Sequence, residues 1–235
     1  MKKFAIIIPT FNEEENIYLL TSSILKLLPK CTIYVIDDTK KKKYSLKFNH
    51  KRIKYFLRKN KSGRGSAVLF GFKKALYAKK FNMFAEMDAD FSHNPKELKK
   101  NLFYFKKKKI DLLIASRYLK KSKIINWNVF RKILSFLSNK LASFLLQINV
   151  SDYTNGFRIY SPRAVKLITK KCGNIGDGFI VLSEILLAIQ SSGYKILEVP
   201  STFVNRKRGE SSVNFSLVFK SLIGLFKLFL IKLNY

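Results

Sequence analysis

Short apolar runs alternate with segments of helical spacing over the first half of this 235-residue chain, and this alternation limits the folds that it can adopt. The apolar runs have the length of strands and cover residues 4–8, 32–36, 53–57, 83–87 and 111–115. The helical segments between them cover residues 13–28 and 65–79, and a third opens at Asn94 and Pro95. Such alternation predicts an α/β fold with a mostly parallel central sheet and helices on both faces.

The second half of the chain is less regular. It is predicted to contain a long helix at 128–147, a strand at 157–160, helices at 162–171 and 178–192, a strand at 195–204 and a helix at 213–233. On a helical wheel the first of these helices gathers its polar side chains on one face, namely Arg131, Ser135, Ser138 and Asn139. Because no repeat or Pro/Gly-rich linker interrupts the chain, we expect one domain over residues 1–212 and an appended helix within 213–235.

The chain carries 46 Lys and Arg residues against 15 Asp and Glu residues, a formal net charge of +31. This charge favours a partner of opposite sign, which is a nucleic acid, an anionic lipid or a phosphorylated substrate. Nucleic acid is the weakest of the three, because the nine arginines do not cluster and no RNP or helix-turn-helix pattern occurs. Lysine runs such as 40–43 and 106–109 are typical of solvated loops and helix ends. We therefore expect no nucleic-acid partner.

The positions of the two cysteines also limit the class of protein that this chain can be. Cys31 and Cys172 are far apart and form no CxxC pair, which argues against a disulfide framework or a zinc site. The first apolar run is too short for a signal peptide and ends at Pro9. These features predict a cytoplasmic protein.

The last predicted helix has the composition of a membrane-interface segment. Thirteen of residues 215–233 are Leu, Ile, Val or Phe, but Lys220, Lys227 and Lys232 interrupt them, at up to about 3 kcal/mol each near a bilayer centre. Lys220 and Lys227 share a face, which favours a helix lying in the interface with its lysines at anionic headgroups. Core or dimer packing and a true membrane span are the alternatives. We expect peripheral attachment to an anionic membrane surface.

Polar and acidic residues follow three predicted strands, at the ends where ligands collect in open parallel sheets. They are the segment 9–13, Asp37 with Asp38, and Asp88 with Asp90. Two carboxylates one residue apart offer the hard oxygen donors that hold a divalent cation and a diphosphate. Most isolated Asp-x-Asp pairs are solvated turn residues, but the convergence of three segments on one sheet edge predicts a ligand site there.

Six motifs occur in an order that resembles one known family. They are Pro-Thr-Phe-Asn-Glu at 9–13, Ile-Asp-Asp at 36–38, Met-Asp-Ala-Asp at 87–90, Ser-Arg-Tyr at 116–118, Ser-Asp-Tyr-Thr-Asn-Gly-Phe-Arg at 151–158, and Glu-Val-Pro at 198–200 with Arg206 and Gly-Glu-Ser at 209–211. Together they resemble glycosyltransferase family 2, and within it the polyprenyl-phosphate (dolichyl-phosphate) mannose synthase group. The resemblance implies the GT-A nucleotide-sugar fold over residues 1–212, with amphipathic interface helices.

The resemblance implies a set of residues that bind the nucleotide-sugar donor. They are Pro9, Thr10, Asn12, Glu13, Asp37, Asp38, Gly65, Asp88 and Ala89. Carboxylates at such positions accept hydrogen bonds from base N–H groups and ribose hydroxyls. A first-turn helix acid, favoured by the helix dipole, is the alternative interpretation of Glu13. Lysines at 40–43 replace the Gly-Ser-rich stretch that is usual in the family, which leaves the nucleobase open.

A metal site is also implied by the resemblance. Asp88 and Asp90 are the expected ligands, and Mg²⁺ or Mn²⁺ bridges carboxylate and diphosphate. Ser92 stands where some relatives place a Gln ligand, and we expect it to act through water. We interpret His93 as a solvent-facing turn residue, because hard cations in such sites prefer oxygen.

The acceptor in such a reaction is a phosphate monoester that is largely ionised at pH 7, so its oxygen needs no general base. The enzyme has to bring two anions together, the acceptor phosphate and the donor diphosphate. Cationic side chains held in fixed positions reduce the repulsion between them. By resemblance the acceptor phosphate contacts Arg117, Arg131, Ser135 and Arg206. The catalytic residues are expected to be Asp90, Arg117 and Arg131. For Arg131, a solvated helix face is the alternative.

Asp152 and Arg158 belong to the family motif and have an equally plain structural interpretation, an ion pair. Neither is expected to be catalytic.

The sequence therefore predicts an inverting glycosyltransferase that moves a hexose onto a polyprenyl or dolichyl phosphate at the cytoplasmic membrane face. Mannose from GDP-mannose is the leading donor, and UDP-glucose or another sugar nucleotide is the alternative. A membrane-bound scaffold with an inactive transferase fold is disfavoured by the intact Asp-x-Asp. Short members of the family work with membrane subunits, so a small membrane partner is also expected.

Overall fold

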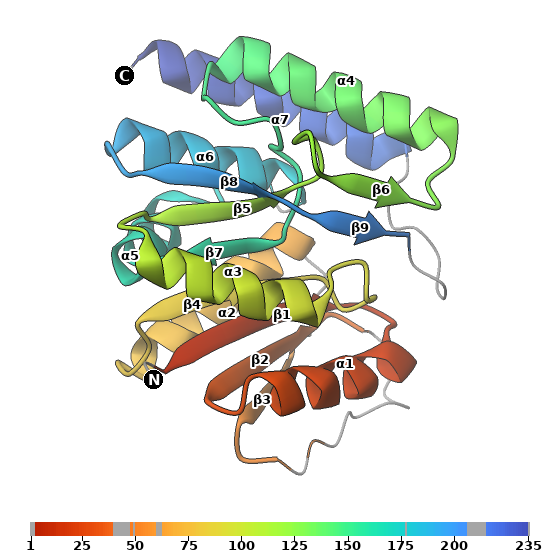
Figure 1. The fold of residues 1–235 in the computed structure, drawn as a ribbon. Coiled ribbons are helices and arrows are strands. Elements are labelled where there is room, and N and C mark those ends of the chain that lie inside the picture. Colours follow the sequence, from red (N-terminus) through yellow and green to blue (C-terminus); the bar gives the residue numbers. More distant parts are fainter. Residues whose placement is uncertain are drawn as a thin grey trace.

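The structure, a computed structural model, describes residues 3–39, 48, 50–59, 63–176, 178–205 and 215–234. Within these residues the central sheet has seven strands in the order β3-β2-β1-β4-β7-β5-β8 (Figure 1). The strands are β1 (Phe4–Thr10), β2 (Cys31–Asp37), β3 (Ile53–Leu57), β4 (Met83–Glu86), β5 (Leu112–Ser116), β7 (Arg158–Tyr160) and β8 (Ile196–Pro200). β7 runs antiparallel to β4 and β5, and the other neighbours pair in parallel. The prediction of a mostly parallel α/β sheet is confirmed.

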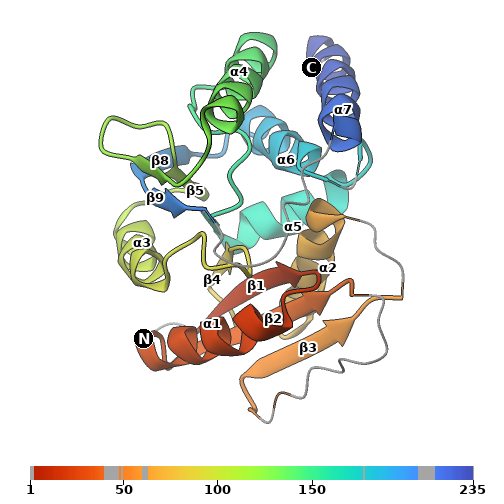
Figure 2. The same cartoon turned by 90° about the vertical axis from the view of Figure 1, so that its right-hand side faces the viewer.

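Helices cover both faces of this sheet. Helices α1 (Glu14–Leu27) and α3 (Pro95–Lys107) lie on one face, and α2 (Arg64–Tyr77), α5 (Pro162–Lys171) and α6 (Ile180–Ser191) lie on the other (Figure 2). Two further helices, α4 (Val129–Leu146) and α7 (Phe215–Leu233), form an outer layer, in which α7 packs against both α4 and α6.

Local capping explains where several helices begin. Asn94, Asn128 and Ser161 each accept a hydrogen bond from a backbone N–H in the first turn of α3, α4 and α5 respectively. Proline follows the cap in α3 and α5, where its missing N–H costs nothing. These signals are local in sequence, and the predicted starts of these helices agree with the structure within a residue or two.

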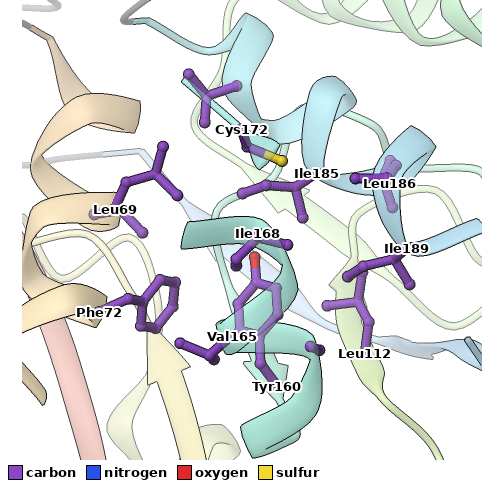
Figure 3. Close-up of a cluster of buried hydrophobic side chains, with 14 of the residues drawn as sticks. Leu69, Phe72, Leu112, Tyr160, Val165, Ile168, Cys172, Ile185, Leu186 and Ile189 are labelled. Carbon is purple, nitrogen blue, oxygen red and sulfur yellow. The ribbon is translucent and has the colours of Figure 1, made fainter. Parts of the chain in front are cut away.

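The continuous apolar strands are buried on both faces. Along β1, Ile6 and Ile8 belong to the core that α1 and α3 cover. Ala5 and Ile7 belong to the opposite core, under α2, α5 and α6. Figure 3 shows this second core, in which side chains from these helices surround Tyr160 of β7. A strand that is buried on both sides needs no polar alternation, which is why the sequence shows continuous runs.

The segment 195–204 differs from its prediction as one strand. It forms β8 and then β9 (Thr202–Val204), which pairs in parallel with β6 (Lys123–Ile125) in a separate two-stranded sheet. The chain changes sheet at Ser201, whose N–H donates to Ser116 O and whose hydroxyl donates to Glu97. β6 was not predicted, because only three residues pair and two of them are exposed.

The first prediction concerns the contact between α2 and α6. A Cβ added at Gly65 would lie 2.5 Å from Val181 Cβ and 2.6 Å from the Gly178 carbonyl oxygen. Gly65→Ala should therefore lower the free energy of unfolding by about 1–3 kcal/mol, measured by urea denaturation. Lys73→Ala, on the exposed side of α2, is the control and should stay within about 0.5 kcal/mol of the parent. Equal stability of both variants would contradict the close approach.

Candidate active site

A pocket opens beside the carboxyl ends of β4 and β5 and continues between α4, α6 and α7. Its polar end is lined by Asp88, Asp90, Arg117, Arg131 and Ser135. The apolar end is lined by Leu134, Ala142, Phe179, Ile180, Leu222 and Leu225. The structure thus brings the predicted metal acids together with two of the predicted phosphate-binding arginines, although they lie more than 25 residues apart in the chain.

The Asp88 carboxylate is bound by Arg64, which was not among the predicted site residues. Arg64, at the start of α2, donates from Nε to Asp88 Oδ1 at 2.7 Å and from Nη1 to Glu86 Oε2 at 2.9 Å. Its third nitrogen donates to the carbonyl of Gly156 at 3.0 Å. Burial acts to lower the pKa of this guanidinium, but the two acids outweigh it and raise the pKa above its ordinary value. Arg64 therefore stays charged and fixes the Asp88 carboxylate.

His93 is buried, so its interpretation as a solvent-facing residue is wrong. Its Nδ1 accepts the Asp88 N–H at 3.0 Å, and its Nε2 lies 3.0 Å from Asn155 Oδ1. The ring stacks on Phe157 with the centroids 4.7 Å apart. Because Nδ1 is an acceptor, the proton belongs on Nε2, which donates to Asn155. The imidazole ties the Asp-x-Asp loop to the loop before β7.

The second acid, Asp90, lies at the pocket and is 9% exposed. Its Oδ1 accepts the N–H of Ser92 at 3.1 Å, and the buried Ser92 hydroxyl has no hydrogen-bond partner among the described residues. In the described part of the chain, no three His, Cys, Asp or Glu side chains cluster as a metal site. Two carboxylates and a nearby unpartnered hydroxyl suit Mg²⁺ or Mn²⁺ shared with a diphosphate, since Mg²⁺ commonly takes one or two carboxylates plus phosphate oxygens. Ser92 does not line the pocket, and its role stays a prediction.

Arg117, directly after β5, forms a buried ion pair with Asp152. Its Nε and Nη2 donate to the two carboxylate oxygens at 2.8 and 2.7 Å, and Nη2 also donates to Thr154 Oγ1 at 2.6 Å. Burial acts to raise the pKa of the Asp152 carboxyl, but Arg117 outweighs it and holds that pKa below its ordinary value. Among the described residues Nη1 of Arg117 makes no hydrogen bond, so its two protons are available to an anion in the pocket.

Asp152 therefore pairs with Arg117, and the expected alternative of an Asp152–Arg158 ion pair is not what the structure shows. Arg158 is fully buried and donates to the backbone carbonyls of Asn155, Leu182 and Tyr153. Its role in the described structure is to tie the loop before β7 to α6.

The predicted polar face of α4 points inward. Arg131, Ser135 and Ser138 line the pocket. Asn139 is buried and accepts the N–H of Tyr153 at 2.7 Å. The alternative interpretation, a solvated helix face, is therefore wrong for this stripe. Arg131 also donates to Asn205 Oδ1 at 2.9 Å, and the next residue, the predicted phosphate ligand Arg206, lies outside the described residues.

Several predicted nucleotide residues gather at the ends of β1 and β2. Thr10 and Asp37 are register partners, and the Asp38 N–H donates to Thr10 O. Asp37 accepts from Tyr55 OH at 2.8 Å. Asp38 is bound by both Nε and Nη2 of Arg58, each at 2.6 Å. A carboxylate can accept more than two hydrogen bonds, so these contacts orient the acids without using all their capacity.

The remaining predicted nucleotide residues flank this group. Asn12 has φ 55° and donates its N–H to Thr39 at 2.8 Å, and Glu13 occupies the position before the first residue of α1. Pro9 lies within β1, and Ala89 lies buried between the two metal acids. Gly65 is required by the α2–α6 packing, which is a structural role in addition to the predicted one. Their roles in binding the nucleotide stay predictions.

Three residues of the pocket and its support were missed. Arg58 and Arg64 orient predicted acids, and Trp127 lines the pocket in contact with both Arg117 and Arg131. The scarcity of arginine was a usable signal, since only nine occur among 46 basic residues. Their acid partners could not be assigned, because each lies 20 or more positions away.

With this geometry in place, comparison with known proteins identifies the class. Residues 5–168 match the model of glycosyl transferase family 2. The polyprenol monophosphomannose synthase of Mycolicibacterium smegmatis is 31% identical, with 89% of this chain and 80% of the relative covered. The undecaprenyl-phosphate mannosyltransferase of Micrococcus luteus is 30% identical, with 93% and 90% covered. The chain belongs to glycosyl transferase family 2 and is a glycosyltransferase.

Solved structures agree on the fold. Glucosyl-3-phosphoglycerate synthase from Mycobacterium tuberculosis, in complex with Mn²⁺, UDP and glucosyl-3-phosphoglycerate, superposes with a TM-score of 0.63 at 15% identity, over 99% of this chain and 78% of that chain. Its complex with Mg²⁺ and UDP gives 0.65 at 14% identity, over 96% and 79%. The fold is the GT-A fold, as the resemblance implied.

The second prediction concerns the buried pair of Arg117 and Asp152. Asp152→Asn should lower the free energy of unfolding at pH 7 by about 3–5 kcal/mol, because it leaves a buried guanidinium unpaired. Asp111→Asn is the matched control, since Asp111 is also buried but its partner Arg163 is 63% exposed and water replaces the lost partner. The free energy of unfolding should fall clearly less in Asp111→Asn than in Asp152→Asn.

The same pair gives a pH dependence. The depressed pKa of Asp152 contributes stability above its unfolded pKa of about 4, and this contribution is lost as the pH falls through the folded value. The stability difference between the parent and Asp152→Asn should therefore narrow below about pH 4. Urea unfolding at several pH values measures it, and equal losses for both Asn variants would contradict the assignment.

Proposed function

We propose that this glycosyltransferase moves a hexose, mannose from GDP-mannose as the leading case, onto a polyprenyl phosphate with inversion at the sugar carbon. The observation that carries the proposal is the pocket, where the Asp88–Asp90 pair and two arginines meet at the mouth of an apolar groove. The names of the two relatives, which act on polyprenol and undecaprenyl phosphate, support the same acceptor class.

The donor end is built from the acids. Asp88 and Asp90 would hold Mg²⁺ or Mn²⁺, and Arg64 keeps Asp88 in place. When bound, the cation neutralises charge on the diphosphate leaving group. The acids at the ends of β1 and β2, Asp37 and Asp38, are positioned by Tyr55 and Arg58 to meet the nucleoside.

The acceptor end is built from cations. Nη1 of Arg117, the guanidinium of Arg131 and the Ser135 hydroxyl line one side of the pocket. They would hold the ionised phosphate monoester, whose oxygen attacks the anomeric carbon while the bond from that carbon to the diphosphate breaks. The products are a glycosyl phospholipid and the nucleoside diphosphate. No proton has to be removed from the acceptor, because the phosphate monoester is largely ionised at pH 7.

The apolar end of the pocket would bind the hydrocarbon chain of the lipid. Beyond the arginines the pocket continues along Leu134 and Ala142 of α4, Ile180 of α6, and Leu225 of α7. These side chains suit the first isoprene units, which carry no hydrogen-bonding group. Because the lining includes residues of both α4 and α7, a lipid whose head reaches the arginines would extend along these two helices.

Helix α4 turns its polar side chains toward the pocket and its apolar side chains outward, and this supports attachment to a membrane surface. Its polar residues face the pocket, whereas Phe130 and Phe144 are 75% and 78% exposed. Val129, Ile133 and Leu137 are also more than half exposed. An exposed apolar face of this size marks an interaction surface. The exposed lysines Lys132 and Lys140 of the same helix would meet anionic headgroups.

Helix α7 extends this apolar face. Phe219, Phe226 and Leu233 are more than half exposed, and Lys220 and Lys227 are exposed beside them. No helix in the described residues is long and apolar enough to cross a bilayer. We propose that α4 and α7 lie together in the interface at the cytoplasmic face, where a small membrane subunit is the further expected partner.

UDP-glucose is the second candidate donor. The solved complexes with this fold contain UDP, and the segment that follows Asp37 and Asp38 departs from the family pattern. The test is incubation with labelled GDP-mannose or UDP-glucose and a short polyprenyl phosphate, with the product identified by mass. A mannosyl phospholipid from GDP-mannose supports the proposal, and a glucosyl product only from UDP-glucose replaces the donor. No lipid product from any sugar nucleotide rejects the acceptor class.

The third prediction concerns the second acid of the pair in the same assay. Asp90→Ala should lower turnover by roughly 100-fold or more, since the cation that stabilises the leaving group loses a ligand. Its thermal unfolding should remain close to that of the parent, and calorimetry should show loss of Mn²⁺-dependent nucleotide binding. Near-normal turnover would contradict the metal role.

The fourth prediction concerns the membrane face. Phe130→Ser with Phe144→Ser should weaken sedimentation with phosphatidylcholine–phosphatidylglycerol vesicles by about tenfold or more, because two large apolar side chains no longer enter the interface. Phe103→Ser is the control, since Phe103 is 63% exposed but lies on α3, away from α4 and α7 in both views (Figure 1, Figure 2). An equal effect of both changes would reject α4 as the membrane contact.

A further inference from the structure

Trp127, the only tryptophan of the chain, lies between the small β6–β9 sheet and the start of α4. It immediately precedes Asn128, the residue that caps α4. The side chain is 7% exposed and lines the pocket, and its ring packs edge-on against Phe203 of β9 with the centroids 5.2 Å apart. The elements next to it in the chain, β6 and α4, and the sequence-distant Phe203 of β9 therefore fix the orientation of the indole.

Both arginines of the acceptor end contact this ring. The guanidinium carbon of Arg131 lies 4.3 Å from the ring centroid, and that of Arg117 lies 5.4 Å from it. Arg131 lies in the first turn of α4, and Trp127 lies just before the residue that caps this helix. Arg117 reaches the ring from the end of β5. One aromatic side chain thus contacts two cations that come from different elements.

Such contacts offset the repulsion between two neighbouring guanidinium groups. The face of an indole carries negative potential, and a desolvated cation above it is held more strongly than one in water. Arg117 is also fixed by Asp152, with only Nη1 left for other contacts. Arg131 donates to Asn205 Oδ1, and its guanidinium carbon lies closer to the ring than that of Arg117. The indole therefore sets the spacing of the two arginines before an anion arrives.

We propose that Trp127 is a positioning residue, which holds Arg117 and Arg131 as one preformed site for a phosphate monoester. The proposal rests on the acceptor end of the proposed function and adds to it the residue that makes two like charges act as a pair. It distinguishes phosphate from uncharged lipid, since an alcohol gains nothing from paired guanidinium groups. Trp127→Leu should therefore weaken binding of a lipid phosphate and leave binding of the lipid alcohol unchanged.

The fifth prediction is tested with farnesyl phosphate and farnesol as probes. Calorimetry should show that Trp127→Leu raises the dissociation constant of farnesyl phosphate by about tenfold, the size expected for two such contacts. Trp127→Phe, which keeps an aromatic face, should recover most of the affinity. The KM for the lipid acceptor should rise more in Trp127→Leu than in Trp127→Phe. The KM for the sugar nucleotide should stay at the parent value in both variants.

Two controls separate positioning from folding. Thermal unfolding and nucleotide binding of each variant report whether the fold is kept, and Trp127→Phe remains informative if Trp127→Leu does not fold. Because Trp127 is the sole tryptophan, fluorescence of the parent should change on saturation with farnesyl phosphate and not with farnesol. A folded Trp127→Leu variant that keeps the parent dissociation constant for farnesyl phosphate would overturn the proposal.

The outcomes also separate this inference from the function on which it rests. If the parent binds farnesyl phosphate more tightly than farnesol and both variants do so equally well, the proposal for Trp127 fails and the acceptor assignment stands. If the parent itself does not prefer the phosphate, the acceptor assignment falls, and the role of Trp127 falls with it.

Discussion

The buried ion pair between Arg117 and Asp152 sets the geometry on which the rest of the pocket depends. It joins the end of β5 to the loop before β7, and Glu198 of β8 fixes the same loop by accepting the N–H groups of Ser151 and Asp152. That loop carries Asn155, which contacts the imidazole beneath the Asp-x-Asp segment. The two ends of the pocket, which we propose bind the donor and the acceptor, are therefore positioned against each other by one connected set of buried polar contacts. Each missing partner would leave an unsatisfied group.

The two kinds of basic residue serve different physical purposes in this chain. Arginines such as Arg58 and Arg64 lie close to acids and bind them through two or more nitrogens, which their planar fork allows. Lysines such as Lys132 and Lys220 stay on the surface, where their charge is solvated. The net charge of +31 therefore comes mainly from lysines, since only nine of the 46 basic residues are arginines. The chemistry of the pocket depends instead on a few buried arginines.

Much of the fold follows from local signals. The predicted strand at 53–57 and the predicted helix at 162–171 match β3 and α5, because apolar runs and caps act within a few residues. The same local reasoning placed Asp37, Asp38, Asp88 and Asp90 at one sheet edge, through the rule that parallel strands end at one edge. The grouping of Arg117 with Arg131 came from the family resemblance, and both line the pocket with Asp88 and Asp90. It could not give the antiparallel insertion of β7 between β4 and β5, which depends on pairing across more than 40 residues.

The sequence by itself determined the alternating architecture, the acids at the strand ends and the existence of a polar stripe on α4, since each is a periodic or adjacent pattern. Tertiary structure decided which partner each charge takes: Arg64 for Asp88, Asp152 for Arg117, and the buried contacts of His93. It also decided that the apolar side of α4 faces outward, beside α7. The reason is physical, because periodicity defines the faces of an element, whereas only packing against distant segments decides which face is covered and which charges are desolvated together.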